Sequence, residues 1–161
     1  MIDKEIKNKR DCTGCHACSN VCPQSCISMV SDSEGFWYPS VDYDNCTKCG
    51  LCVKVCSTIN KPIIQNIPKA YACINKNEDI RLESSSGGIF TLVAEQVIDS
   101  SGVVFGATFD ESFYVIHKYI ETKEELIELR GSKYVQSRID DTYKQVKQFI
   151  KQGRRVLFTG I

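Results

Sequence analysis

The stretch that decides the fold is "CTGCHACSNVCP", which runs from Cys12 to Pro23. Its four cysteines have the spacing C-x2-C-x2-C-x3-C, and a proline follows the last one. A shift of 34 residues places this stretch on a second one, "CTKCGLCVKVCS" (residues 46–57), with all four cysteines in register. Repetition at a fixed offset indicates a duplicated unit, so we expect two similar halves in the first part of the chain.

The composition sets the context for these thiols. All ten cysteines of the 161 residues lie between Cys12 and Cys73. The opening "MIDKEIKNKRD" lacks the apolar segment of a signal peptide, and no apolar run approaches the roughly 18 residues of a membrane span. Twenty Lys and Arg balance 20 Asp and Glu, which favours neither nucleic acid nor an anionic membrane as partner. We therefore expect a soluble cytoplasmic chain, where clustered thiols indicate metal binding or redox chemistry.

The spacing is typical of [4Fe–4S] ligation in ferredoxins with two clusters. In that arrangement the fourth cysteine of each run ligates the other cluster. The predicted ligands of the first cluster are Cys12, Cys15, Cys18 and Cys56, and those of the second cluster are Cys46, Cys49, Cys52 and Cys22. Zinc is the alternative, although paired C-x2-C knuckles usually have a longer gap between them. A zinc-binding interaction module is thus the weaker hypothesis.

Four nearby residues need an interpretation. Cys26 competes with Cys22 as a ligand, but the proline after Cys22 matches the bacterial ferredoxin run. We therefore interpret Cys26, and likewise Cys73 in "AYACI", as small buried hydrophobic residues. His16 is interpreted as a loop residue that tunes the cluster, and His117 as a strand side chain.

The loss of cysteines after residue 73 suggests a domain boundary. We expect a two-cluster ferredoxin-type domain at residues 1–60, a linker at 61–68 that contains two prolines, and an α/β domain with a mixed sheet at 69–161. The first domain should contain a hairpin of strands 26–30 and 36–41. The predicted fold class is α+β.

Strands and helices alternate in the second domain. The predicted strands are 70–75, 103–109, 113–120 and 154–160, and the predicted helices are 84–102, 122–129 and 140–153. The helix at 84–102 should present one apolar face, formed by Ile89, Leu92, Val93, Gln96 and Val97.

Two segments of this domain are candidates for ligand binding. "SSSGG" (residues 84–88) precedes a helix, where backbone N–H groups favour phosphate and glycine permits close approach. The alternative is a helix cap with a flexible turn. "RGSKYVQS" (residues 130–137) is suited either to an anionic or planar ligand or to a solvated polar turn.

The order of motifs resembles a known family. The ferredoxin pair is followed by five stretches, namely "PKAYACIN" (68–75), "SSSGGIF" (84–90), "GVVFGATFD" (102–110), "LRGSKYVQS" (129–137) and "RRVLFTG" (154–160). Together they resemble the coenzyme F420 hydrogenase/dehydrogenase beta subunit family, in particular the bacterial members encoded near polysaccharide biosynthesis genes. Family members run further past "FTG", so the resemblance implies an incomplete member.

The resemblance implies a function. Members are flavoproteins that pass electrons between iron–sulfur clusters and FAD, and in archaea on to F420. It implies FAD beside two [4Fe–4S] clusters, with Ser86, Gly87, Gly88 and Lys133 on the flavin side. It also implies an oxidoreductase whose partner is a redox protein or flavoprotein, with oligomer formation left open. The alternative is a stand-alone ferredoxin-type carrier whose second domain has lost flavin binding.

Overall fold

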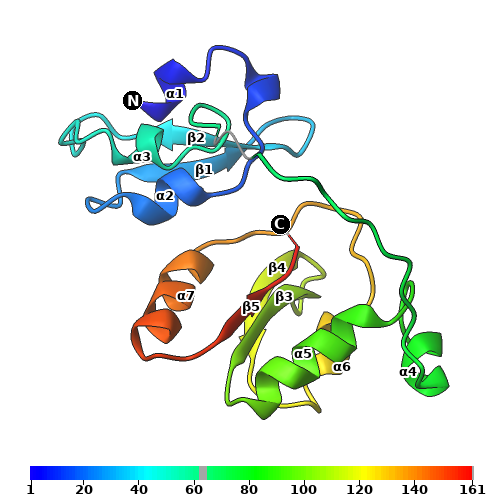
Figure 1. Ribbon diagram of the computed structural model, residues 1–161. Coiled ribbons are helices and arrows are strands. Elements are labelled where there is room, and N and C mark those ends of the chain that lie inside the picture. The colour runs from blue at the N-terminus through cyan, green and yellow to red at the C-terminus, as the bar shows by residue number, and fades with distance from the viewer. Residues whose placement is uncertain (62–64, 161) are drawn as a thin grey trace. The chain divides into compact units, whose positions relative to one another are not determined.

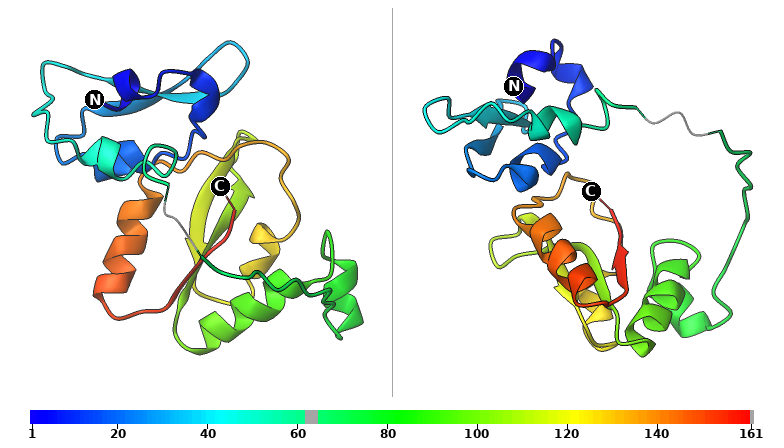
Figure 2. Two further views of the ribbon diagram at one scale, coloured as in Figure 1. Left: turned by 45° about the horizontal axis from the view of Figure 1, so that its top comes forward. Right: turned by 60° about the vertical axis from the view of Figure 1, so that its left-hand side comes forward.

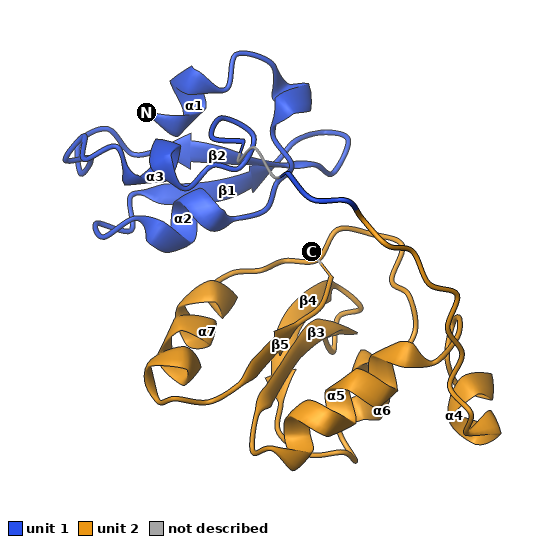
Figure 3. Cartoon of the chain, viewed as in Figure 1, with its two compact units in different colours: residues 1–67 blue, residues 68–161 orange. Residues whose placement is uncertain are grey.

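The protein is described from a computed structural model, which covers residues 1–61 and 65–160. The chain divides into two compact units, Met1–Ile67 and Pro68–Ile161 (Figure 3). Each unit is described by itself below. Residues 62–64 of the expected linker lie outside the described residues.

Unit 1 is built around the expected hairpin. Strands β1 (Ile27–Ser31) and β2 (Trp37–Val41) pair in antiparallel fashion, which confirms the predicted hairpin. The turn between them is held by Asp32, whose Oδ1 accepts hydrogen bonds from the backbone N–H groups of Glu34 (3.0 Å) and Phe36 (3.1 Å). The helices of the unit are short: α1 (Ile2–Glu5), the 3-10 turn η1 (Lys9–Asp11), α2 (Ala17–Val21) and α3 (Leu51–Lys54).

The apolar core of unit 1 is small and rich in sulfur. Its buried members are Ile2, Cys18, Cys26, Ile27, Val41 and Cys52, so three of the six are cysteines. Very small domains bury little apolar surface and are only marginally stable, so they commonly need metals or disulfides. The same cysteine side chains therefore form part of the apolar core and are also available for thiol chemistry.

Unit 2 contains a mixed three-stranded sheet in the order β4-β3-β5 (Figure 1). Strand β3 (Val103–Phe109) pairs antiparallel with β4 (Val115–Ile120) and parallel with β5 (Val156–Phe158). These pairings confirm the predicted strands and the partly parallel sheet, and the fold class is α+β as expected. The three residues of β5 are half-buried.

Helices cover both faces of this sheet. On one face, α5 (Ile89–Asp99) and α6 (Leu126–Leu129) pack through a cluster that includes Ala94, Val104 and Ile120. On the other face, α7 (Thr142–Lys151) brings Phe149 within 6.1 Å of Phe105, measured between ring centroids. Figure 2 shows the sheet between these helices. None of the described helices is long and apolar enough to cross a membrane.

Residues 70–75 do not form the predicted strand. The segment has no strand partner among the described residues, and the backbone N–H of Asn75 instead donates to the carbonyl of Gly87 (2.6 Å). A short helix, α4 (Glu78–Leu82), follows where none was expected. The segment is therefore extended chain tied to the loop in front of α5.

The helix predicted for residues 84–102 is shorter and faces the core differently. α5 begins only after Gly88, which caps it with a left-handed φ of 72°. Thr91 and Ala94 are fully buried, whereas Leu92 and Val93 are 53% and 40% exposed. The predicted apolar face was right for Val97, which packs against the core cluster, and wrong for Leu92 and Val93. The fully buried positions are the small residues Thr91 and Ala94, which allow α5 to approach the sheet closely.

Candidate metal centres and cofactor pocket

The first predicted ligand set surrounds one hollow in unit 1. This hollow, of about 20 Å³, is lined by all four cysteines of the set, Cys12, Cys15, Cys18 and Cys56. Cys12 caps the end of η1, Cys18 lies within α2, and Cys56 follows α3. The structure thus brings together residues from both cysteine runs at this point.

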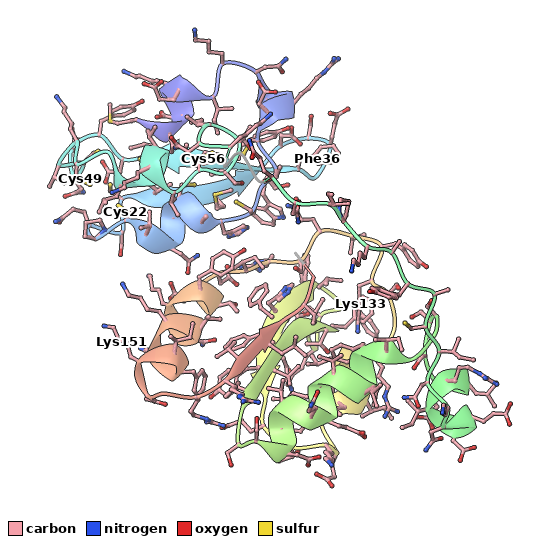
Figure 4. The ribbon with its side chains drawn as sticks, viewed as in Figure 1. Cys22, Phe36, Cys49, Cys56, Lys133 and Lys151 are labelled. Atoms are coloured by element: carbon pink, nitrogen blue, oxygen red, sulfur yellow. The ribbon has the colours of Figure 1, made fainter. Side chains whose placement is uncertain are left out.

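The second predicted ligand set surrounds a larger hollow. Its four cysteines, Cys22, Cys46, Cys49 and Cys52, line a cavity of about 210 Å³ whose other walls are largely apolar. Figure 4 labels Cys22 and Cys49 at the same end of unit 1, and Cys56 away from them. We call the two cavities the first and the second hollow.

The two short helices account for the exchange of cysteines between the runs. Cys18 lies inside α2 and lines the first hollow, whereas Cys22, at the C-terminal cap of the same helix, lines the second. The advance is four residues, or about 6 Å along a helix. Cys52, in α3, and Cys56, just beyond it, repeat this division in reverse. Neither hollow is complete with one run alone.

The loops between cysteines share an unusual backbone geometry. Gly14 and His16 have left-handed φ values of 61° and 60°, and the residues 34 positions later, Lys48 and Gly50, have 57° and 77°. Left-handed residues turn the chain sharply, which lets successive cysteine side chains point to one side of the loop. The internal repeat is therefore conserved in backbone conformation as well as in cysteine spacing.

Burial makes free thiolates unfavourable at the first hollow. Burial raises the pKa of Cys18 to about 12. The pKa of Cys12 is also raised, mainly by burial, with Cys15 and Cys56 adding to it. Thiolates are the form that binds metal, so a cation in the hollow would supply the missing compensation.

Cys22 has a different environment. Burial acts to raise its pKa, but backbone N–H groups of residues 24–26 and the Cys26 thiol hold the pKa of Cys22 below its usual value. Such N–H donors directed at sulfur are among the features that set cluster potentials.

The donor chemistry fits [4Fe–4S] clusters. Each hollow presents the four thiols of its predicted ligand set among mostly apolar walls, and four thiolates are the ligand set that cubane clusters take. Among residues 1–61 and 65–160, no three His, Cys, Asp or Glu side chains are placed as ligands of one metal ion. A cubane carries its thiolates on separate irons, and its ligands lie further apart than those of a single ion.

Of the residues interpreted beside the predicted ligands, only Cys73 departs from its sequence-based interpretation. Cys26 is buried as expected, but its Sγ lies 3.3 Å from the Sγ of Cys22 and lines the second hollow. His16 is buried, lines the first hollow, and its ring centroid is 6.0 Å from that of Trp37. Cys73 is exposed, so its interpretation as a buried residue was wrong.

A third cavity lies in unit 2, between the two segments singled out in the sequence. Ser84–Gly88 and Leu129–Ser132 line a pocket of about 330 Å³ in front of α5. The backbone N–H of Ser132 donates to Ser85 Oγ (2.8 Å), which ties the two segments together. Gly87 is required there, because a Cβ would lie 2.4 Å from the carbonyl oxygen of Cys73.

Three of the four predicted flavin-side residues line this pocket. Ser86, Gly87 and Gly88 are among its walls, and Lys133 is not. The Lys133 Nζ donates to the backbone carbonyls of Arg130 (2.8 Å) and Glu128 (3.3 Å), and burial lowers its pKa. Figure 4 shows Lys133 on the loop that follows α6.

Arg130 is the charged residue at the pocket wall. Its Nε donates to Thr91 Oγ1 (3.1 Å), and its guanidinium pairs with Glu83. The pocket therefore combines a cation, small hydroxyl side chains and the N-terminal turn of α5.

Comparison with known proteins agrees with both units. The family described as "4Fe-4S dicluster domain" matches residues 11–59. The family described as "Coenzyme F420 hydrogenase/dehydrogenase, beta subunit N-term" matches residues 70–143.

Two curated relatives resemble part of the chain. An uncharacterized ferredoxin of Methanocaldococcus jannaschii is 30% identical over 78 residues, which are 48% of this chain and 99% of the relative. NADH-quinone oxidoreductase subunit I of Pelobacter propionicus is 36% identical over 64 residues, 35% of this chain and 34% of the relative. The chain thus spans about a third of the length of that subunit.

Proposed function

From the families to which the chain belongs, we propose that it transfers electrons between two [4Fe–4S] clusters and a flavin or F420-like acceptor within a redox complex. Over residues 11–59 it belongs to the 4Fe-4S dicluster ferredoxins. Over residues 70–143 it belongs to the N-terminal part of the coenzyme F420 hydrogenase/dehydrogenase beta subunits. The observation that carries the proposal is that the eight predicted ligand cysteines line two separate hollows, with one complete predicted set of four at each. The clusters would supply the one-electron chemistry.

The protein's own residues then hold the clusters and shape their surroundings. Cys12, Cys15, Cys18 and Cys56 would bind the first cluster, and Cys22, Cys46, Cys49 and Cys52 the second. Apolar walls exclude water, and the N–H groups directed at Cys22 stabilise its thiolate. Both effects act on the reduction potential.

The pocket of unit 2 is proposed as the flavin side. Ser86, Gly87 and Gly88 lie before the first turn of α5, where N–H groups favour a diphosphate. Arg130 places a guanidinium at the pocket wall, where it also pairs with Glu83. Lys133 is assigned to holding its own loop through the carbonyls of Glu128 and Arg130. The alternative function is a ferredoxin-type carrier without flavin.

Anaerobic reconstitution tests the proposal. We expect about eight irons and about eight sulfides per chain, four of each per cluster, and FAD retained in stoichiometric amount. Clusters without flavin would favour the carrier, and stoichiometric zinc without iron would exclude both hypotheses. Gly87→Ala should abolish FAD retention and leave the iron unchanged, because the added Cβ meets Cys73 O. Gly153→Ala is the control: it strains the backbone after α7 (φ 77°), away from the pocket and without a steric clash, so it should lower stability but leave FAD retention unchanged.

The crossed ligand assignment has its own test. Cys15→Ala with Cys56→Ala removes two ligands from the first site, so about four irons should remain in an intact second cluster. The matched pair Cys49→Ala with Cys56→Ala takes one ligand from each site and should leave no intact cluster. The reverse pattern would show that each run ligates its own cluster.

A further inference from the structure

The second hollow contains a fifth thiol that the ligand assignment does not use. Cys26 lines this cavity together with Cys22, Cys46, Cys49 and Cys52. We propose that Cys26 is a reserve ligand of the second cluster, which takes the place of Cys22 when that thiol is lost. The inference rests on the proposed clusters and concerns which residues hold them.

The geometry places the two thiols at the same corner of the hollow. Cys22 Sγ and Cys26 Sγ are 3.3 Å apart. A turn brings them together: the backbone N–H of Ser25 donates to the carbonyl of Cys22 (3.2 Å), and Ser25 has a left-handed φ of 50°. The turn thus brings the side chain of Cys26 beside that of Cys22, four residues earlier in the chain.

One hydrogen bond of the Cys26 backbone does not involve Cys22. Its carbonyl accepts a hydrogen bond from the backbone N–H of Asp42 (2.8 Å), just beyond the β1–β2 pairing. Only 6% of its surface is exposed, so the thiol lies inside the unit. Loss of the Cys22 side chain would leave Cys26 in position beside the vacated corner.

The exchange is a simple ligand substitution. The Cys26 thiol gives its proton to water, and its sulfur forms the bond to the iron that Cys22 would otherwise hold. No electron is transferred, and the number of thiolates on the cluster stays at four. Thiolate is the ligand that iron–sulfur clusters accept, so the substitution preserves the chemistry of the site.

The internal repeat supplies a control within the same chain. The residue 34 positions after Cys26 is Asn60, and the one 34 positions after Cys22 is Cys56. The Asn60 side chain is exposed, and its Nδ2 donates to the carbonyl of Val53 (2.7 Å). The first hollow has no thiol at this place, so Cys56 has no substitute there.

The test compares four variants with the wild-type chain after anaerobic reconstitution. Wild type and Cys26→Ala should each hold about eight irons. Cys22→Ala should also hold about eight, and its oxidised clusters should be silent in EPR, as four-iron clusters are. Cys22→Ala with Cys26→Ala, and Cys56→Ala alone, should fall below eight, and any three-iron cluster that remains should give an EPR signal.

The outcomes separate this inference from the proposed function. If Cys22→Ala loses as much iron as the double variant while wild type holds about eight, Cys26 is not a reserve ligand. A wild-type chain that binds no iron would overturn the proposed clusters, and the inference with them. Cys22→Ala and the double variant both lack the Cys22 thiol. A folding defect caused by that loss would lower the iron content of both variants equally, and this result would count against the inference.

Discussion

At the scale of single residues, the cysteine loops depend on left-handed backbone at four places. Two of these places are glycines, Gly14 and Gly50, and two are not, His16 and Lys48. An L-residue pays about 1–2 kcal/mol for this conformation. Each cysteine loop therefore contains one strained non-glycine residue, His16 in the first loop and Lys48 in the second.

Gly50→Ala should isolate this strain. A Cβ at Gly50 meets nothing within 4 Å, so the cost is one of backbone conformation alone. We expect destabilisation by about 1 kcal/mol, seen as a lower urea midpoint for bleaching of the visible absorbance. Lys54→Ala, an exposed helical position, should change the midpoint little. Equal effects of the two variants would mean that φ at residue 50 is not a constraint.

His117 is a buried histidine whose hydrogen bonds define one tautomer. Its Nε2 lies 3.0 Å from the carbonyl oxygen of Thr159, so this nitrogen carries the proton, and Nδ1 accepts from Ser137 Oγ (2.6 Å). Burial lowers the pKa of His117, which the carbonyls of Thr159 and Gly160 oppose in part. The folded state therefore favours the neutral ring.

The pH dependence follows from this direction. Below about pH 6.5, the unfolded chain binds a proton that the folded chain takes up only at lower pH. Stability should thus be full above that pH and should decline as the pH falls below it. We expect the thermal midpoint of unit 2 to fall between pH 7.5 and pH 5.5 by more in wild type than in His117→Gln. Equal declines would assign the pH effect to other groups.

At the scale of elements, α5 illustrates how packing selects a helix face. The buried positions are Thr91 and Ala94, both with no exposed surface, while Leu92 is 53% exposed. Amphipathic pattern alone favoured the larger aliphatic residues. Small side chains facing the sheet allow close packing against Val104 and Ile120, which the pattern does not encode.

A substitution at the small residue Ala94 should therefore cost more stability than a substitution at the larger residue Leu92. Ala94→Leu overpacks the interface and should cost about 1–3 kcal/mol. Leu92→Ala removes a larger side chain from an exposed position and should cost about 0.5 kcal/mol or less. Thermal unfolding followed by far-UV circular dichroism measures both. A greater loss for Leu92→Ala would restore the predicted face.

At the scale of the whole molecule, the two units differ in what holds them together. Three of the six buried core residues of unit 1 are cysteines, whereas the sheet of unit 2 buries Val103, Val104 and Phe105 with no exposed surface. In unit 1 the proposed metal binding is thus part of folding, as in other small metal-dependent domains.

Removal of the clusters should separate the two units. After anaerobic treatment with oxidant and chelator, we expect amide protons of β1 and β2 to lose protection from hydrogen exchange. Those of β3 and β4 should keep it, because their core contains no cysteine. Retained protection in β1 and β2 would show that the apolar core of unit 1 suffices without metal.

Local signals account for the features that sequence reasoning predicted. Cysteine spacing pointed to the two ligand sets, and alternation of apolar residues with turn residues predicted the β1–β2 hairpin and strands β3 and β4. The segment 70–75 was misassigned because its apolar residues resemble a strand, yet strands need partners that sequence does not supply. The family resemblance implied that Lys133 lies on the flavin side, and in the structure its ammonium group donates to backbone carbonyls.

The amino-acid order alone determined the duplication and the α+β class, and it predicts the two ligand sets, because spacing and periodicity are properties of neighbours along the chain. Folding decided the rest. It placed the thiols of Cys22 and Cys26 3.3 Å apart, gathered residues 84–88 and 129–132 around one pocket, and turned Ala94 rather than Leu92 to the sheet. These features depend on distances between side chains after the chain has packed, which no local pattern contains.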